Sequence, residues 1–113
     1  MDLNRGMRAP ISGLVLLVAM ITILLMVGTL PAQDSAEDIY NHKCAVCHGK
    51  DGLGNTVKGK KVHVKDVHAN MKHTQAEMIK VVTDGKGDMD SYKKEFTPEQ
   101  IKALVDYYRS LAK

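Results

Sequence analysis

Hydrophobic residues gather first in one unbroken run near the N-terminus. No charged residue occurs from position 9 to position 33, and the stretch Ile11 to Val27 is almost wholly apolar. Arg5 and Arg8 precede the run, and acidic residues follow it from Asp34 onward. A basic end before an apolar core is typical of an export signal whose basic end stays inside the cell. The pattern therefore predicts one hydrophobic N-terminal helix and an exported remainder.

The length of the apolar run leaves two fates open for it. Signal-peptide cores have about 7–15 apolar residues, whereas a spanning helix needs about 17–25. Cleavage after Ala32 would place the bulky Leu30 where a small residue is expected, which favours an uncleaved anchor. We divide the chain into residues 1–33, a signal peptide or N-terminal membrane anchor with residues 9–30 in the membrane, and the exported domain 34–113.

Polar and apolar positions in the exported part predict short helices. Ser35 is a capping residue before a helix that contains both cysteines and ends at Gly49. Thr74 and Glu77 have the spacing of a capping box, and the helix that they begin ends at Gly85.

The last helix has the clearest pattern. Thr97 caps it, Pro98 takes its first position and Gln100 completes a second capping box. Its apolar residues form one stripe at helical spacing: Ile101, Leu104, Val105, Tyr108 and Leu111. Residues 49–71 are rich in glycine and lysine without a period and predict an exposed loop. No alternating run of Val, Ile and Thr occurs, so the fold class is all-α.

The segment "NHKCAVCHGKDGLG", residues 41–54, holds both cysteines of the chain. Cys44 and Cys47 lie three positions apart, and His48 follows directly. Residues three apart share one side of a helix, so both sulfurs can reach the two vinyl groups along one haem edge. His48 lies on the same turn and can place its ring under the iron. Cys-x-x-Cys-His is the signature of covalent haem attachment.

Two other chemistries use cysteines at this spacing. A dithiol redox motif needs a βαβ setting, which this helical chain does not offer. A zinc site needs four ligands, and the other two would have to come from histidines at irregular spacing. Thiols outside the cytoplasm are normally oxidised, which also calls for a cofactor that uses them. The sequence favours haem over both alternatives.

A second axial ligand for the iron has several candidates in the sequence: Met71, Met78, Met89, His63, His68 and His73. Met78 belongs on the apolar stripe of the middle helix, where methionine usually fills the core. Met71 could reach the iron only if the preceding loop folds back. Met89 lies in "GKGDMDSY", a loop without helical pattern that can present a thioether, and we favour it.

"CAVCHGKDGLGN", followed by "DGKGDMDSYKKEFTPEQIKALVDYYRSLA", resembles the class I cytochromes c of the small bacterial monohaem type over residues 39–112. The resemblance implies a small cytochrome c fold of three or more short helices around one covalently bound haem c. It makes Cys44 and Cys47 the thioether anchors and His48 and Met89 the axial ligands of the iron.

The resemblance also implies packing, and it has two departures. Tyr40 would meet the last helix near Leu104 and Tyr107 or Tyr108. Asp90 replaces the proline that often follows the methionine. No proline occurs between positions 31 and 98, so the backbone carbonyl that would orient His48 is not identified.

An iron ligated on both faces has no open position for a substrate, which indicates an electron carrier rather than an enzyme. The net charge is +3, and residues 43–72 carry seven lysines against two aspartates. This excess predicts a basic surface beside the haem that docks acidic surfaces of redox protein partners. The expected location is the periplasmic side of the cytoplasmic membrane, or the soluble periplasm after cleavage. Nucleic acid is not an expected partner, because the basic stretch lacks interleaved aromatics.

Two alternative functions stay open. A weak or absent second ligand would make the iron five-coordinate and the protein a gas sensor or a peroxidase-like enzyme. An anchored cytochrome subunit of a respiratory complex would use residues 9–30 to contact partner helices, although Gly13 and Gly28 do not form a Gly-x-x-x-Gly motif.

Overall fold

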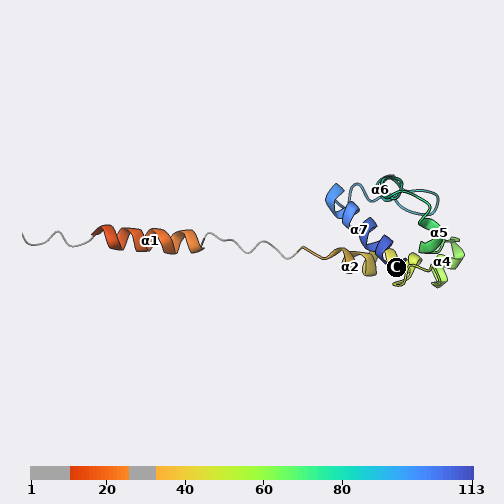
Figure 1. The fold of residues 1–113 in the computed structure, drawn as a ribbon, viewed down its shortest axis with the longest axis horizontal. Helices are drawn as coiled ribbons and strands as arrows, with labels where there is room; N and C mark the ends of the chain where they lie inside the picture. The colour runs from red at the N-terminus through yellow and green to blue at the C-terminus, as the bar shows by residue number, and fades with distance from the viewer. Residues whose placement is uncertain (1–10, 26–32) are drawn as a thin grey trace, which may run out of the picture. The chain divides into compact units, whose positions relative to one another are not determined.

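The structure is a computed structural model that describes residues 11–25 and 33–113. It divides into two units, Met1–Ala32 and Gln33–Lys113, which are described separately. The first unit contains helix α1, Ile11–Leu25, which covers most of the predicted hydrophobic helix (Figure 1). The remaining residues of the predicted anchor, 9, 10 and 26–30, lie outside the described residues. Within the described ranges, no helix is both long enough and apolar enough to cross a membrane.

The second unit is built from short helices joined by loops, as predicted. Among residues 33–113 no strand is present, and the fold is all-α. The elements are α2 (Ala36–Ile39), η1 (Tyr40–Cys44), α3 (Ala45–His48), α4 (Val57–Lys61), α5 (Val67–Asn70), α6 (Gln75–Asp84) and α7 (Pro98–Ser110).

The first three elements of this unit form one continuous helical stretch. The Ser35 hydroxyl accepts a hydrogen bond from the Asp38 N–H at 3.1 Å, as its capping role predicts. The stretch ends at Gly49, whose φ of 78° is in the left-handed region that favours glycine.

A π-helical turn, η1, interrupts this stretch and was not predicted. The Ala45 N–H donates to the carbonyl of Tyr40, five residues earlier. One extra residue in a turn rotates the rest of the helix by about 100° relative to a regular α-helix. In this register Tyr40 and Ala45, five residues apart, are both buried, whereas Cys44 is half-buried.

Tyr40 is the centre of the contact between this stretch and α7. It is 2% exposed and packs in one cluster with Ile39, Ala45 and Leu104. Its ring centroid lies 5.2 Å from that of Tyr107 and 6.3 Å from that of Tyr108. These contacts confirm the predicted crossing of the helical stretch that carries the cysteines with the last helix, α7. The Tyr40 hydroxyl donates to the Gly49 carbonyl at 2.7 Å, so Tyr40 also fixes the end of α3.

Helices α6 and α7 begin where the capping boxes predicted. Both boxes are complete, one at Thr74 and Glu77 and the other at Thr97 and Gln100. Helix α7 packs against α2 and η1 as well as α6, so it connects the two ends of the unit. Figure 1 shows α7, in blue, running between α2 and α6.

The prediction of a plain loop over residues 49–71 was wrong, because α4 and α5 lie within it. The hydroxyl of Thr56 accepts from the Gly59 N–H and donates to the Val46 carbonyl, both at 2.8 Å, which starts α4 on the surface of α3. Asp66 caps α5 by accepting from the His68 N–H at 2.7 Å. Helices of four or five residues are too short to show a hydrophobic period, so only their caps could have indicated them.

Candidate functional site

A cavity of about 890 Å³ opens in the helical unit. The size lies within the range of about 300–1,000 Å³ that is usual for small-molecule and cofactor sites. Its walls come from η1 and α3, from the segment 62–65, from α6 and the loop after it, and from α7. The four residues that the sequence singled out all line it: Cys44, Cys47, His48 and Met89.

Cys44 and Cys47 both reach the cavity as free thiols and are half-buried. Burial, followed by the nearby Cys47, raises the pKa of the Cys44 thiol to about 11. Cys44 is therefore protonated at neutral pH and is not an activated nucleophile. This favours a thioether anchor over a dithiol redox centre.

His48 ends α3 and presents a half-buried imidazole. Burial lowers its pKa, so the ring is neutral at neutral pH, which is the form that binds metals. Its Nδ1 is buried and has no hydrogen-bond partner among the described residues.

The backbone carbonyl that was expected to hold the His48 ring is therefore not found in the described part of the chain. In the segment after α3, the Gly59 carbonyl accepts from the Val64 N–H at 2.9 Å. The carbonyls of Val46 and Cys47 both accept from the Thr56 hydroxyl, at 2.8 and 3.1 Å.

Met89 lies in a tight turn of the loop after α6. Its N–H donates to the Lys86 carbonyl at 3.0 Å, and the Lys86 N–H donates back to the Met89 carbonyl at 2.9 Å. The Ser91 hydroxyl fastens the same loop to the Thr83 carbonyl at 2.6 Å. Although Asp90 replaces a proline, these hydrogen bonds hold the backbone of Met89 beside the cavity.

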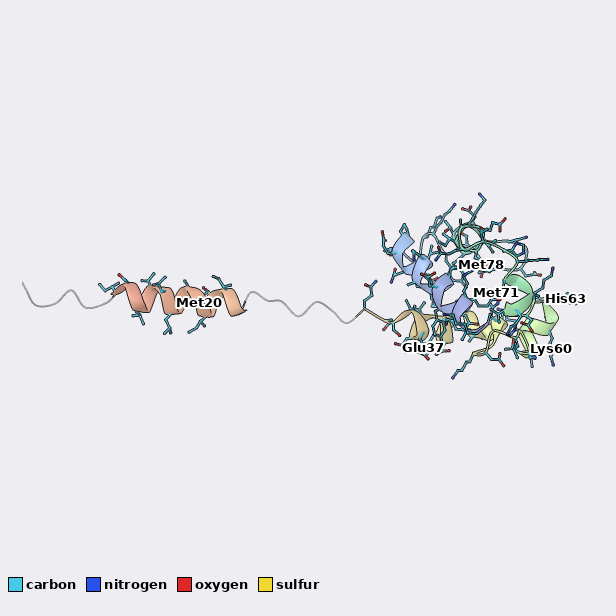
Figure 2. The ribbon with its side chains drawn as sticks, in the orientation of Figure 1. Met20, Glu37, Lys60, His63, Met71 and Met78 are labelled. Carbon is cyan, nitrogen blue, oxygen red and sulfur yellow. The ribbon has the colours of Figure 1, made fainter. Side chains whose placement is uncertain are left out.

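The other predicted ligand candidates divide into those that line the cavity and those that do not. Met78 is buried and lines it, but its sulfur is in contact with a guanidinium nitrogen of Arg109 at 3.7 Å. Met71 is half-buried and is not part of the lining. Figure 2 shows Met71 and Met78 within the helical unit and His63 at its edge.

Two of the three candidate histidines also line the cavity. His63 and His73 contribute to its wall and are exposed, whereas His68 lies outside it and pairs with Asp66 at 2.8 Å. His63 has a φ of 57°, which is unusual for a residue with a side chain.

Sequence reasoning missed two residues of the site. Tyr108 was predicted only at the helix crossing, but it also lines the cavity and meets the His48 ring edge-on, with centroids 5.2 Å apart. Asn70 lines the cavity as well, and its side-chain amide donates to the Tyr108 hydroxyl at 2.8 Å. These two residues are 38 positions apart, and no sequence pattern connects them.

Charged residues of both signs line the cavity. Three lysines of the stretch 43–72 are among them: Lys43, Lys58 and Lys65. Helix α6 and the loop of Met89 contribute acidic residues, Glu77, Asp84, Asp88 and Asp90, together with Lys80 and Lys86. Part of the lysine excess predicted over residues 43–72 therefore lies at the cavity, where it is accompanied by carboxylates.

The lining fits a covalently bound haem. Two thiols one helical turn apart, a half-buried neutral imidazole and a thioether share one cavity whose exposed lining is mostly apolar. A zinc site would need a different donor set, and the described residues contain no group of three or more His, Cys, Asp or Glu that could hold an ion.

Comparison with known proteins gives a consistent result. Residues 31–107 match the family model described as "Cytochrome C oxidase, cbb3-type, subunit III". The chain is 32% identical over 85 residues to the cbb3-type cytochrome c oxidase subunit FixP of Azorhizobium caulinodans, which covers 74% of this chain but only 29% of FixP. It is 33% identical over 70 residues to cytochrome c6 of Leptolyngbya boryana, covering 61% of this chain and 80% of that protein.

Among solved structures, the KustC0563 c-type cytochrome matches with a TM-score of 0.65 and 27% sequence identity. The match covers 71% of this chain and the whole of that one. Together with the Cys-x-x-Cys-His turn on the cavity wall, these matches establish the cofactor as one covalently bound haem c. The chain belongs to the family of c-type cytochromes described as subunit III of cbb3-type cytochrome c oxidase.

Proposed function

We propose that residues 34–113 form a one-electron carrier whose haem is anchored by Cys44 and Cys47 and ligated by His48 and Met89. The observation that carries the proposal is that these four side chains, from two segments some forty residues apart, line one cavity. The bound haem supplies an iron that gains and loses one electron.

The chain's own residues would keep that iron closed to substrates. His48 is neutral at neutral pH, so it can serve as a ligand without first losing a proton. The hydrogen-bonded turn of Met89 keeps its thioether available from the loop. A His and Met pair raises the reduction potential relative to other ligand sets, and it leaves no open position. Both effects suit a carrier rather than a catalyst.

Partner recognition would use the lysines of residues 43–72 that line the cavity. Lys58 and Lys65 are exposed there, and Val46 between the two cysteines is 55% exposed. An apolar centre beside lysines suits brief docking to an acidic redox protein, with association rates that fall as salt increases. We place this encounter on the periplasmic side of the membrane, with residues 1–33 as signal or anchor.

The visible spectrum of the purified holoprotein tests the ligand assignment. Oxidised protein should show the weak charge-transfer band near the red end that a thioether on iron produces, and Met89→Ala should abolish it. Met78→Leu is the matched control, because it removes the other thioether of the cavity and should leave the band intact. Loss of the band in Met78→Leu, with retention in Met89→Ala, would reassign the ligand.

Carbon monoxide separates the carrier from a sensor or a peroxidase-like enzyme. A five-coordinate iron would bind the gas in the reduced state and change its spectrum at once. We expect the reduced parent protein to keep its spectrum and Met89→Ala to respond. A parent protein that responds as fully as the variant would contradict the carrier proposal.

A second candidate function is that of an anchored cytochrome subunit in a respiratory complex. The match to an oxidase subunit family and to FixP favours it, although the chain spans less than a third of FixP. Extraction from native membranes with a mild detergent should then bring other chains with the protein. Recovery of the protein alone would count against this candidate.

A further inference from the structure

Histidines that bind a metal are usually oriented by a hydrogen bond to the other ring nitrogen. His48 lacks this support, since its buried Nδ1 has no partner in the part of the chain that the structure describes. Rotation of the imidazole about its bond to Cβ must therefore be limited by packing. The ring contacts that surround His48 decide which orientation it takes.

Tyr108 supplies the aromatic contact to His48. The two ring centroids lie 5.2 Å apart with an interplanar angle of 69°, which is the edge-to-face arrangement that aromatic pairs prefer. Tyr108 comes from α7, so the contact joins the last helix to the haem-attachment helix. Both residues line the same cavity.

Tyr108 is itself held by two contacts. The Asn70 amide donates to its hydroxyl at 2.8 Å, and Asn70 is the last residue of α5. The ring centroid of Tyr108 also lies 6.3 Å from that of Tyr40 in η1, whose own hydroxyl donates to the Gly49 carbonyl at 2.7 Å. Two elements that are distant from α7 in sequence thus hold the ring that touches His48.

We propose that Tyr108, held by Asn70, is the positioning residue that sets the orientation of the His48 imidazole in the haem protein. The inference rests on the proposed role of His48 as an iron ligand. In low-spin ferric haem the plane of an imidazole ligand directs the half-filled iron orbital. A turn of the ring therefore changes the EPR g-values, the hyperfine-shifted NMR signals of the haem methyl groups and the reduction potential.

The variants that test this proposal remove the contact in steps. Tyr108→Leu removes the ring, Tyr108→Phe removes only the hydroxyl, and Asn70→Ala removes only its donor. The matched control is Tyr107→Leu. Tyr107 is the neighbouring tyrosine of α7, and its ring centroid lies 5.2 Å from that of Tyr40, but it is not part of the cavity lining.

We expect Tyr108→Leu holoprotein to show changed g-values, a changed order of methyl shifts and a shifted midpoint potential. Tyr108→Phe and Asn70→Ala should shift the potential less and in the same direction. The double variant Tyr108→Phe/Asn70→Ala should shift the potential no more than the larger of the two single variants, because both substitutions remove the same hydrogen bond. Tyr107→Leu should lower the melting temperature and leave the spectra and the potential unchanged.

Two results would overturn the proposal. One is parent-like spectra and potential in Tyr108→Phe, Asn70→Ala and Tyr108→Leu with only a lower melting temperature, which would make Tyr108 a core residue. The other is an equal spectral change in Tyr107→Leu, which would point to general loosening of the helix crossing. The two mild variants keep the test decisive if Tyr108→Leu does not fold.

Failure of the proposed function has a different signature. In that case the parent protein lacks the thioether band, or the Met89→Ala variant retains it. If the band behaves as expected and the Tyr108 series is silent, only the positioning role is lost.

Discussion

Asp106 joins α6 to α7 through its carboxylate. It accepts hydrogen bonds from the Lys102 ammonium at 2.7 Å and from the side-chain amide of Gln75 on α6. The bond from Lys102, followed by that from Gln75, lowers the pKa of this carboxyl below its ordinary value of 3.8. The same direction of shift applies to Asp66 and Glu77, whose carboxylates accept backbone N–H groups at helix caps.

These lowered pKa values predict the acid limb of the stability profile. The folded protein binds fewer protons than the unfolded chain near pH 4, so the contribution is complete above the unfolded pKa and is lost as pH falls through the folded one. We expect the contribution of these three carboxylates to be constant down to about pH 5 and then to decline. Denaturant melts between pH 3 and pH 7 should show a weaker acid decline in Asp106→Asn than in the parent.

Asp34→Asn is the control for that experiment. Asp34 is exposed, and no hydrogen bond or ion pair of its side chain occurs among the described residues. Its variant should follow the acid limb of the parent protein. If the free energy of unfolding of Asp106→Asn coincided with that of the parent at every pH, the Asp106 carboxylate would make no contribution to the pH dependence of stability.

At the scale of the element, a glycine lets the loop after α3 approach the wall of the cavity. Gly54 has a φ of 70°, and its N–H donates to the His48 carbonyl at 2.7 Å. A Cβ at this position would lie 2.9 Å from the carbonyl oxygen of Val64, so the segment that carries His63 would have to move.

Substitution of Gly54 by alanine therefore has two costs. The left-handed φ costs about 1–2 kcal/mol for any side chain, and displacement of the Val64 backbone adds to it. Substitution of Gly87 by alanine has only the cost of the left-handed φ, because its φ is 57° and no atom lies within 4 Å of a Cβ at that position. We expect Gly54→Ala to lower the free energy of unfolding by more than Gly87→Ala in paired denaturant melts. Equal losses would show that the close approach to Val64 is not needed.

The sequence anticipated the elements whose signals are local. Caps at Ser35, Thr74 and Thr97 placed the starts of three helices, and the spacing of Cys44, Cys47 and His48 indicated the haem turn. Elements shorter than one hydrophobic period escaped prediction, which is why α4 and α5 were taken for loop. The π-turn η1 also escaped, since an inserted residue has no signature in a stretch that is helical on both sides.

Contacts between distant segments were the harder part of the site. Met89 could be chosen because a loop without helical period pointed to it. The pair of Asn70 and Tyr108 could not, because it depends on how α5 and α7 come together in space. The lack of a partner for the His48 Nδ1 was equally hidden, since it depends on where the loop after α3 places its carbonyls in space.

At the scale of the whole molecule, the haem domain encloses a large cavity with a small core. The buried hydrophobic residues of the described chain number eight: Ile39, Tyr40, Ala45, Val67, Met78, Ile101, Leu104 and Val105. A domain of this size buries little apolar surface, so a bound apolar group adds a large share of the total. A ligand that binds only the folded state raises the stability of the folded protein, and a covalent link makes that contribution permanent.

Removal of the attachment sites should therefore unfold much of the domain. We expect Cys44→Ala/Cys47→Ala protein without haem to lose helical circular dichroism and a cooperative thermal transition, both of which the holoprotein should show. An apoprotein that melts cooperatively at the temperature of the holoprotein would mean that the eight-residue core is sufficient. Tyr107→Leu holoprotein provides the comparison for simple loss of core packing.

The π-turn also sets a rule for transplanting this haem site into designed helical proteins. A graft of residues 44–48 onto a straight host helix would carry two thiols and an imidazole, but they would inherit the host's own register. In this helix the buried Tyr40 and the cysteine turn are joined by a π-helical turn, with one extra residue between Tyr40 and Ala45. The shortest segment to transplant is therefore the stretch from Tyr40 to Gly49, which includes the π-turn.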